Sequence, residues 1–556
     1  MKAAPWERPF SYFIKKKQFI WNLEENHYIC KIENYSNRIM SDKKLPIGVQ
    51  NFESLRQDGY FYVDKTSHVY NLVNRGRYYF LSRPRRFGKS LLLSTIEAYM
   101  QGKKELFEGL AIYELEKEWV KHPIFHLDLN SQKYDSPESL EYVLEDALSY
   151  WESLYGTNES EKSLSLRFQG VIRRACEKTG QRVVILVDEY DKPMLQAIGN
   201  EELQKAFRNT LKPFYGCLKS MDGYIKLGFL TGVTKFGKVS VFSDLNNLDD
   251  ISMDERYIDI CGISEQELQH HFREDIEELG AKLKLSYEDT CNILKEQYDG
   301  YHFCEDSIGM YNPFSLLNTF KKNKLGSYWF ETGTPTYLVE LLQLHNYSLE
   351  KMSQIETDED VLNSVDSSST DPIPVIYQSG YLTIKGYDPV FGLYKLGFPN
   401  KEVEDGFLKF LMPYYTSKNK VDSPFEIRNF VSEILSGNHE GFLRRLQSFF
   451  ADTTYEQIPD MEIYYGNVLF IVFKLAGMYV KSEYHTSNGR ADLVMQTDKY
   501  IYVMEFKLDQ SAEAALQQIN EKQYALPFIT DTRKLFKIGI NFSSAKRNID
   551  HWIVEE

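Results

Sequence analysis

The sequence predicts an α/β protein with an open parallel sheet first, a helical and mixed region next, and a smaller α/β domain last. Two observations indicate the first sheet: the strand at 78–82 runs through a tight loop into an apolar helix at 90–100, and the β-branched run 183–187 ends in two acidic residues. Such runs are typical of strands buried on both faces of a parallel sheet. After residue 480 the order of strands, turn and helix indicates the second sheet.

The loop at 83–90 has the pattern of a phosphate-binding loop. Gly88, Lys89 and Ser90 open the helix, where backbone N–H groups and the helix dipole favour an anion. In this pattern Lys89 reaches the β- and γ-phosphates and Ser90 offers its hydroxyl to Mg²⁺. Arg83 replaces the first glycine of the general pattern, so a basic turn before a surface helix stays the alternative. We expect ATP to bind through these residues: Arg85, Arg86, Phe87, Gly88, Lys89, Ser90 and Leu91.

Asp188 and Glu189 stand at the end of the second buried strand. Ligands of parallel sheets bind at the carboxyl ends of strands, so these residues are expected to face the loop. We predict that Asp188 holds the Mg²⁺ water shell and that Glu189 polarises the attacking water; a helix-capping Asp is the alternative. Thr231, at the end of a neighbouring strand, either senses the γ-phosphate or satisfies its own turn. Arg208 and Arg256 are candidates for an arginine finger.

The remaining elements of the first part follow from periodicity. Strands are expected at 123–129 and 224–230 and helices at 137–152, 167–179 and 201–217, which places helices on both faces of the sheet. A capping box at 264–267 predicts a helix that runs through His271. Beyond it, 358–371 reads as an exposed loop, and 376–385 and 394–399 as short strands. The expected boundaries are an N-terminal extension at 1–44, the sheet domain at 45–260, the middle region at 261–450 and the last domain at 451–556.

The last domain is predicted to contain helices at 461–478 and 511–523 and strands at 481–485, 490–495, 500–507 and 535–542. Glu505 and Lys507 lie two apart on one strand and therefore face the same side. Asp492 lies on the preceding strand, across a short turn at 498–499. We predict that Asp492 and Glu505 bind Mg²⁺ or Mn²⁺ and that Lys507 orients a water or stabilises the transition state. A cross-strand ion pair on an exposed edge is the alternative.

Composition limits the classes of function. The 556 residues carry a net charge of −15, so nucleic acid would have to bind a local basic patch. The six cysteines include no Cys-x-x-Cys pair, which indicates reduced thiols and a cytoplasmic protein. No apolar run approaches the roughly 20 residues of a membrane span. Residues 1–39 are either a genuine extension or the product of an upstream start codon, with Met40 as the alternative start.

Many of these motifs resemble those of bacterial AAA-ATPase-like proteins that carry a C-terminal domain of the PD-(D/E)xK nuclease superfamily. Arg83 departs from the general phosphate loop but agrees with this family. The resemblance implies an AAA/ASCE-like P-loop NTPase sheet and a restriction-endonuclease-like C-terminal domain, with Glu462 as a further carboxylate on the first helix of that domain. The matching segments are 45–52, 62–66, 83–90, 187–191, 231–236, 246–250, 298–301, 311–313, 332–335, 379–383, 489–492, 505–507 and 515–519 with Tyr524.

Three hypotheses of function follow. The first is an ATPase whose module controls a metal-dependent nuclease acting on DNA, with RNA less favoured. The second is a signalling or scaffold ATPase whose nuclease-like domain only binds nucleic acid. The third is a nucleotide-dependent protein-interaction switch without nucleic acid, which the acidic pI of 5.4 favours. A homo-oligomer is compatible with each of them.

Overall fold

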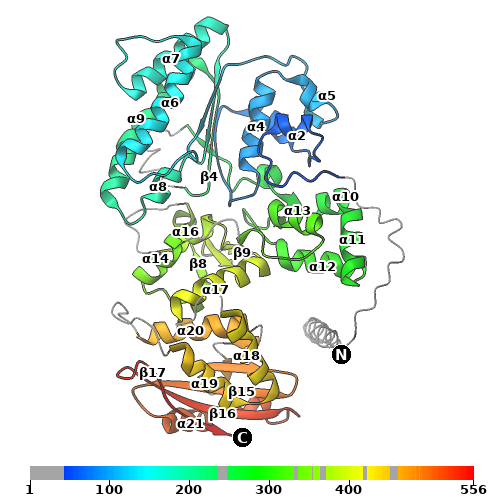
Figure 1. The fold of residues 1–556 in the computed structure, drawn as a ribbon, viewed down its shortest axis with the longest axis vertical. Coiled ribbons are helices and arrows are strands. Elements are labelled where there is room, and N and C mark those ends of the chain that lie inside the picture. Colours follow the sequence, from blue (N-terminus) through cyan, green and yellow to red (C-terminus); the bar gives the residue numbers. More distant parts are fainter. Residues whose placement is uncertain are drawn as a thin grey trace, which may run out of the picture. The chain divides into compact units, whose positions relative to one another are not determined.

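A five-stranded parallel sheet forms the core of the N-terminal part (Figure 1). The structure, a computed structural model, describes residues 43–235, 247–330, 336–353, 355–363, 371–416, 423–450, 461–476, 479–481, 484–486 and 489–556. Met40 and nearly all of the expected N-terminal extension lie outside this range. The strand order is β2-β3-β4-β1-β5. The bounds are β1 Tyr78–Ser82, β2 Ile124–Asp128, β3 Val183–Asp188, β4 Ile225–Gly232 and β5 Asp249–Asp250.

The expected α/β architecture of this part is confirmed. Every strand pair in the sheet is parallel, and β1 and β3 are buried along their whole length. Strand β4 lies between β1 and β3, so the loop after β1 and the acidic end of β3 flank the end of β4. This edge is where the phosphate loop and the carboxylates were expected to meet.

Helices cover both faces of this sheet (Figure 1). Helix α6 buries Leu140, Leu144, Leu148 and Trp151, and this spacing of three to four residues keeps one face against the core. Proline at its first turn and glycine at its C-cap set its ends. On one face lie α6 Pro137–Tyr155, α7 Leu164–Thr179 and α9 Glu201–Ser220; on the other lie α2 Phe52–Gln57 and α4 Lys89–Met100, with α3 Thr66–Arg75 packed on α4.

The middle region combines helices with a small antiparallel sheet. The predicted capping box is present, since Ser264 and Glu267 bond each other's backbone at the start of α10. The sheet order is β8-β10-β9. The bounds are α10 Glu265–His271, α11 Arg273–Leu283, α12 Tyr287–Tyr298, α13 Pro313–Lys322, α14 Thr336–Leu344, β8 Ile355–Thr357, α15 Glu359–Leu362, α16 Ile373–Gln378, β9 Thr383–Asp388, β10 Leu393–Gly397 and α17 Lys401–Tyr415.

Two predictions for this region were wrong in part. The strand expected at 376–385 begins only at Thr383, because the preceding apolar run forms α16 with Pro374 in its first turn. A short apolar run does not distinguish a buried helix from a strand. The loop expected at 358–371 contains α15, which Asp358 caps through the Val361 amide. Residues 364–370 lie outside the described range.

The C-terminal domain is built on a second five-stranded sheet, of order β11-β14-β15-β16-β17. Strands β14 and β15 are antiparallel, whereas β15 and β16 are parallel and are connected through α21. The bounds are α20 Met461–Leu475, β11 Tyr479–Lys481, β12 Tyr484–Thr486, β13 Gly489–Ala491, β14 Leu493–Gln496, β15 Tyr500–Leu508, α21 Ala512–Glu521, β16 Lys534–Ser543 and β17 Asn548–Glu555.

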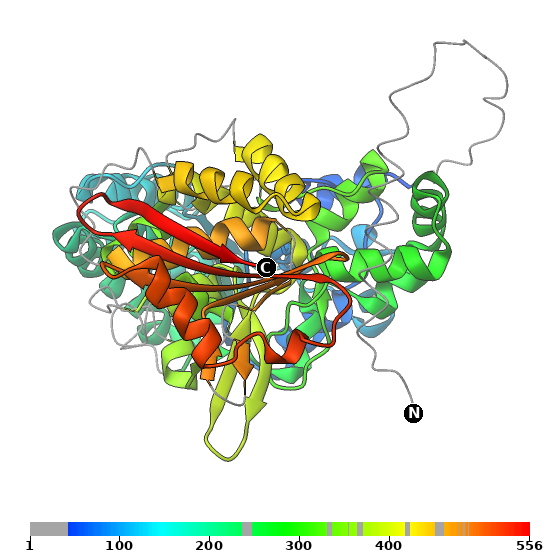
Figure 2. The ribbon, with the colours of Figure 1, turned by 90° about the horizontal axis from the view of Figure 1, so that it is seen from below.

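Both faces of this sheet are covered (Figure 2). Ile501 and Val503 of β15 pack with α21, whereas the alternate residue Tyr502 packs on the other face against Phe442, with ring centroids 5.5 Å apart. Phe442 belongs to α19, His439–Phe450, and the Tyr502 hydroxyl donates to the Ile434 carbonyl of α18, Ser423–Ser436, at 2.7 Å. Packing on the sheet thus extends to residues that precede the boundary expected at 451.

The C-terminal domain also differs from the prediction in its strands. The strand expected at 481–485 is divided between β11 and β12, which belong to different sheets. The terminal strand β17 was not predicted, because its residues alternate poorly between polar and apolar and its pairing with β16 is long-range. Within the described residues, the five cysteines are free thiols, and no helix is both long and apolar enough to cross a bilayer.

Candidate functional site

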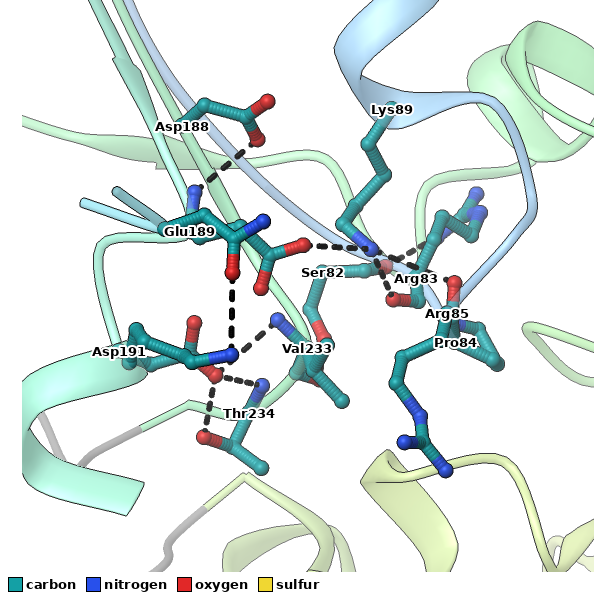
Figure 3. A network of polar contacts seen from close by, with 12 residues as sticks. Ser82, Arg83, Pro84, Arg85, Lys89, Asp188, Glu189, Asp191, Val233 and Thr234 are labelled. Carbon is teal, nitrogen blue, oxygen red and sulfur yellow. Dashed lines mark hydrogen bonds and ion pairs between the residues drawn. The ribbon is translucent and has the colours of Figure 1, made fainter. Parts of the chain in front are cut away.

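The loop between β1 and α4 places Lys89 at the carboxyl edge of the sheet (Figure 3). Gly88, the N-cap of α4, has φ +99°, a left-handed conformation that glycine adopts without strain. Lys89 is 4% exposed, and its Nζ donates to the carbonyls of Arg83 at 3.1 Å and Pro84 at 3.3 Å. The same Nζ lies 3.9 Å from Glu189 Oε1. The ammonium is therefore held between the loop and the acidic strand.

Asp188 is the last residue of β3 and Glu189 follows it, opposite this lysine (Figure 3). Asp188 is buried, which raises its pKa, and the nearby Ser90 side chain acts in the opposite direction. Glu189 has φ +51°, an uncommon backbone conformation for a side-chain-bearing residue. The helix that follows, α8, begins at Lys192 after its N-cap Asp191. Asp188 does not cap it, so the capping alternative is wrong.

Thr231 and Asp191 complete this edge of the sheet. Thr231 is fully buried, and its hydroxyl makes no hydrogen bond within the described part of the chain, so it does not satisfy its own turn. Asp191 Oδ2 accepts bonds from the Val233 amide at 3.1 Å and from the Thr234 amide and hydroxyl at 2.6 and 2.7 Å. Burial raises the pKa of Asp191 to about 6. This unpredicted residue ties the end of β4 to the acidic strand.

The second constellation lies on the C-terminal sheet. Glu505 is 2% exposed on β15, a central strand, and Lys507 Nζ lies 3.1 Å from Glu505 Oε1. Asp492 precedes β14, and its Oδ2 accepts the Phe506 amide at 2.8 Å. Burial, followed by the nearby Asp492 charge, raises the pKa of Glu505 to about 7. The predicted trio is brought together, and the alternative of an ion pair on an exposed edge is wrong.

Both constellations offer polar atoms without a protein partner. Among the described residues, Glu505 Oε2 and Asp191 Oδ1 are buried and make no hydrogen bond, as is the case for the Thr231 hydroxyl. Buried polar atoms in native proteins nearly always have a partner, which can be water, an ion or a ligand. Carboxylate oxygens in such positions suit a divalent cation with oxygen ligands.

Each of these two constellations lies within a stretch of the chain that a known family matches. A family model described as predicted AAA-ATPase matches residues 46–242, and one described as PD-(D/E)XK nuclease superfamily matches residues 460–552. A protein of Azotobacter chroococcum mcd 1, described as an uncharacterized protein in the vnfD 5′ region, is 33% identical over 530 residues. That alignment covers 93% of this chain and 99% of the relative.

The chain belongs to the AAA-ATPase-like proteins with a C-terminal PD-(D/E)XK nuclease superfamily domain.

An apolar pocket lies beside the loop between β1 and α4 of this AAA-ATPase-like protein. About 620 Å³ of this region is not filled by protein atoms, and part of that space is open solvent. Sequence reasoning missed it, because its lining comes from stretches that lie far apart in the chain. The lining includes Gly88 and Leu91 of the loop and helix α4, Phe61 and Val63 from the N-terminal motif, and Ile263, Phe272 and Leu317 from the middle region.

Arg83 stands where the general phosphate loop has glycine. Its guanidinium is 1% exposed and donates to the carbonyls of Ser82, Ser252 and Tyr257 at 2.7–3.1 Å. Its Cζ lies 3.9 Å above the ring centroid of Phe303. Burial lowers the pKa of Arg83 to about 10, which leaves the side chain charged at neutral pH. Arg83 thus anchors the loop to the segment that follows β5.

Other predicted loop residues face the middle region. Arg85 Nη2 donates to the Tyr381 hydroxyl at 3.0 Å, and the Arg85 carbonyl accepts from Trp329 Nε1 at 2.9 Å. Arg86 lies over the ring of Phe314, and the ring of buried Phe87 meets that of Tyr301 with centroids 4.8 Å apart. Arg85, Arg86 and Phe87 can therefore serve a ligand through their backbone, while their side chains hold the loop.

The remaining candidates lie elsewhere. Arg208 donates to Gln204 in its own helix, and Arg256 is paired with Asp254. Neither contact brings an arginine to the loop. Glu462 falls in the first turn of α20, and its side chain lies outside the described residues.

Gln518 of α21 was not assigned a role from the sequence. Its Oε1 accepts from Lys507 Nζ at 2.7 Å, and its Nε2 donates to Glu505 Oε1 and to the Tyr524 hydroxyl. The amide thus bridges the carboxylate and the lysine of the nuclease-like site. The signal available from the sequence was the resemblance of 515–519 and Tyr524 to the family, which gave no geometry.

Proposed function

We propose that the protein binds and hydrolyses ATP with Mg²⁺, and that this ATPase module controls a Mg²⁺- or Mn²⁺-dependent nuclease acting on DNA. One observation carries the proposal: each of two sheets brings a lysine and two carboxylates together at one site. These are Lys89 with Asp188 and Glu189, and Lys507 with Asp492 and Glu505. Membership of the family supports both halves.

The nucleotide half uses the edge of the parallel sheet. Backbone N–H groups of the loop and Lys89 would hold the phosphates, and Ser90 with Asp188 would hold Mg²⁺. The Thr231 hydroxyl would contact the γ-phosphate or the attacking water, which Glu189 would polarise. The apolar pocket that adjoins Gly88 and Leu91 would take the base, since ligand pockets are mostly apolar with few polar groups.

The nuclease half uses the face of the C-terminal sheet. Asp492 and Glu505 would hold the metal, which supplies Lewis-acid stabilisation of a scissile phosphate and a more acidic bound water. Lys507, fixed by Glu505 and Gln518, would orient that water or neutralise developing charge. The five cysteines in the described part of the chain are free thiols, which supports a location in a reducing compartment such as the cytoplasm.

The test is cleavage of supercoiled and linear plasmid by the purified protein, with and without Mg²⁺, Mn²⁺ and ATP, and with RNA of matched length as a comparison. Asp492→Ala should abolish cleavage, and Lys89→Ala should change its dependence on ATP. The matched control is Asp498→Ala, at an exposed carboxylate in the turn between β14 and β15. Absence of metal-dependent cleavage in the wild type under every nucleotide condition would overturn the nuclease half. Cleavage that is indifferent to ATP and to Lys89→Ala would overturn the control by ATP.

A further inference from the structure

A turn in the middle region, Gln378–Tyr381, contacts two separate parts of the candidate ATP site. It ends helix α16 and leads towards β9. Gln378 is 5% exposed and Tyr381 is fully buried. None of its residues was assigned a function from the sequence, although 379–383 matched a family motif.

The first contact of the turn is with the end of β4. The amide of Lys235, four residues beyond Thr231, donates to Gln378 Oε1 at 2.6 Å. Gln378 Nε2 in turn donates to the Leu362 carbonyl at 2.5 Å, so both ends of the side-chain amide are fixed. Lys235 Nζ also bonds Asn363 at 2.7 Å and Asp250 at 2.9 Å. The chain that leaves β4 is therefore held by the middle region immediately after the Asp191–Thr234 contacts.

The second contact is with the phosphate loop. Gly380 has φ +88°, and a Cβ added to it would lie only 2.5 Å from the Pro84 Cβ. Glycine is thus required both by the backbone conformation and by the close approach of the loop. The adjacent Tyr381 hydroxyl accepts from Arg85 Nη2 at 3.0 Å. Arg85 is directed away from Lys89 (Figure 3), so it serves this contact while the loop backbone stays beside Lys89.

The Tyr381 side chain is packed between aromatic rings of the middle region. Its ring packs against Trp329 and Phe407 with centroid distances of 5.2 Å each, and Trp329 also bonds the Arg85 carbonyl. A side chain that is packed on several sides has few alternative rotamers, so its hydroxyl is a fixed acceptor. The loop therefore meets a preformed surface.

We propose that the Gln378–Tyr381 turn positions the ATP site from the middle region, with Gln378 fixing the end of β4 and Gly380 with Tyr381 fixing the phosphate loop. The inference rests on the proposed ATPase. None of these residues touches the reacting atoms. They set the distance from the loop beside Lys89 to Thr231 at the end of β4 and to Glu189 and Asp191, which follow β3. Hydrolysis depends on that distance, because small displacements of positioned groups cost large factors in rate.

The experiment compares Gly380→Ala with Gly392→Ala. Gly392 has φ +67° at the turn between β9 and β10, where an added Cβ meets nothing closer than the Tyr387 hydroxyl at 4.0 Å. Both variants strain a left-handed glycine, but only Gly380→Ala pushes on Pro84. Tyr381→Phe is added because it keeps the packed ring and removes the hydroxyl that accepts from Arg85. Measured quantities are kcat and KM for ATP, the melting temperature, and amide hydrogen exchange of residues 83–90 without nucleotide.

Gly380→Ala is expected to lower kcat at least about tenfold and to speed hydrogen exchange of the loop, while Gly392→Ala changes neither. Tyr381→Phe should lower kcat about threefold to tenfold, in keeping with the loss of one hydrogen bond to a charged group. Unchanged kcat and unchanged loop exchange in Gly380→Ala would overturn the proposal, as would equal losses in Gly392→Ala. If the wild type binds no ATP, the proposed function fails, and the hydrogen-exchange comparison alone decides this inference.

Discussion

Arg83 occupies the position at which the general phosphate loop has glycine, and its side chain stabilises the loop through contacts that glycine cannot make. The residue has no left-handed φ, so its position in the loop tolerates a side chain. The guanidinium bonds three carbonyls and stacks on Phe303. A buried charge without hydrogen bonds would be costly, and these carbonyls offset that cost. Arginine thus anchors the loop here.

Substitutions of Lys89 and Glu189 should separate the binding of ATP from its hydrolysis. Lys89→Ala removes the cation held at the loop and should abolish ATP binding measured by calorimetry. Glu189→Gln keeps the shape but loses the charge that would polarise water, so it should bind ATP with unchanged affinity and hydrolyse it at least about a hundredfold more slowly. Unchanged affinity in Lys89→Ala would contradict the assignment of the loop.

Asp191 gives a prediction that depends on pH. Its pKa is raised from 3.8 to about 6 by burial, so the folded state disfavours the ionised form. The penalty is absent below about pH 4 and complete above about pH 6. Asp191→Asn should therefore raise the melting temperature at pH 7.5, by a stabilisation of at most about 3 kcal/mol, and should give no gain near pH 4.

The control for this prediction is Asp222→Asn. The hydrogen bond from Arg77 lowers the pKa of Asp222, whereas burial raises the pKa of Asp191. The folded state therefore favours the ionised form of Asp222, and Asp222→Asn should not stabilise the protein at pH 7.5. A lower melting temperature of Asp191→Asn at pH 7.5 would show that the charged hydrogen bonds to Val233 and Thr234 outweigh the cost of burial.

At the scale of elements, strand β15 carries the nuclease-like site because it is central in its sheet. Its alternate residues pack on both faces, which fixes the strand, and its C-terminal half then presents Glu505 and Lys507 on one side. Helix α21 packs on the same side of the strand and contributes Gln518, which accepts a hydrogen bond from Lys507. The site therefore depends on the packing of one helix against one strand pair.

Variants of these elements should separate metal binding from cleavage. Asp492→Ala or Glu505→Ala should lose metal binding in calorimetry and lose cleavage, while ATP hydrolysis remains, because the two sites lie in different domains. Lys507→Ala should keep metal binding and lose cleavage. Gln518→Ala should reduce cleavage by about tenfold, since it releases one hydrogen bond to each of two site residues.

The control for Gln518→Ala is Gln517→Ala, at an exposed neighbour that bonds Glu521 on the same helix. This variant should cleave as the wild type does. Cleavage that survives Asp492→Ala would show that another site, or a contaminant, is responsible.

At the scale of the whole molecule, the match to the AAA-ATPase family begins at residue 46. Within this part, Phe52 and Leu55 are fully buried in the core beside α4. Lys43 bonds the His271 carbonyl and Asp275 of the middle region. The part of the chain needed for the ATPase fold is thus expected to begin close to residue 43.

Deletion of residues 1–39 should leave the fold and ATP binding intact. The melting temperature should change by less than about 2 °C, because the family match begins only at residue 46. A chain that begins at Thr66 is the control, and it should be strongly destabilised because it lacks Phe52 and Leu55. A large loss of stability in the shorter deletion would show that residues 1–39 pack on the core.

The sequence by itself determined the parallel sheet, the edge at which Lys89 meets Asp188 and Glu189, and the spacing of Glu505 and Lys507. These follow from local patterns: buried strands are apolar throughout, a phosphate loop joins a strand to a helix, and residues two apart on a strand share a face. Each such pattern is read within a few residues of the chain. Local pattern could not decide whether Asp188 caps a helix or belongs to the site, because both roles place a carboxylate at the same position.

Tertiary structure alone decided the rest. Long-range contacts set the anchoring of Arg83, the Asp191–Thr234 bonds, the bridge made by Gln518, the apolar pocket and the contacts of the Gln378–Tyr381 turn. Their hydrogen bonds join residues that lie 11 to almost 300 positions apart. The terminal strand β17 and the helix α16 were likewise set by their neighbours. Contacts of this kind depend on how elements pack in three dimensions, and propensity and periodicity describe only what each segment can do by itself.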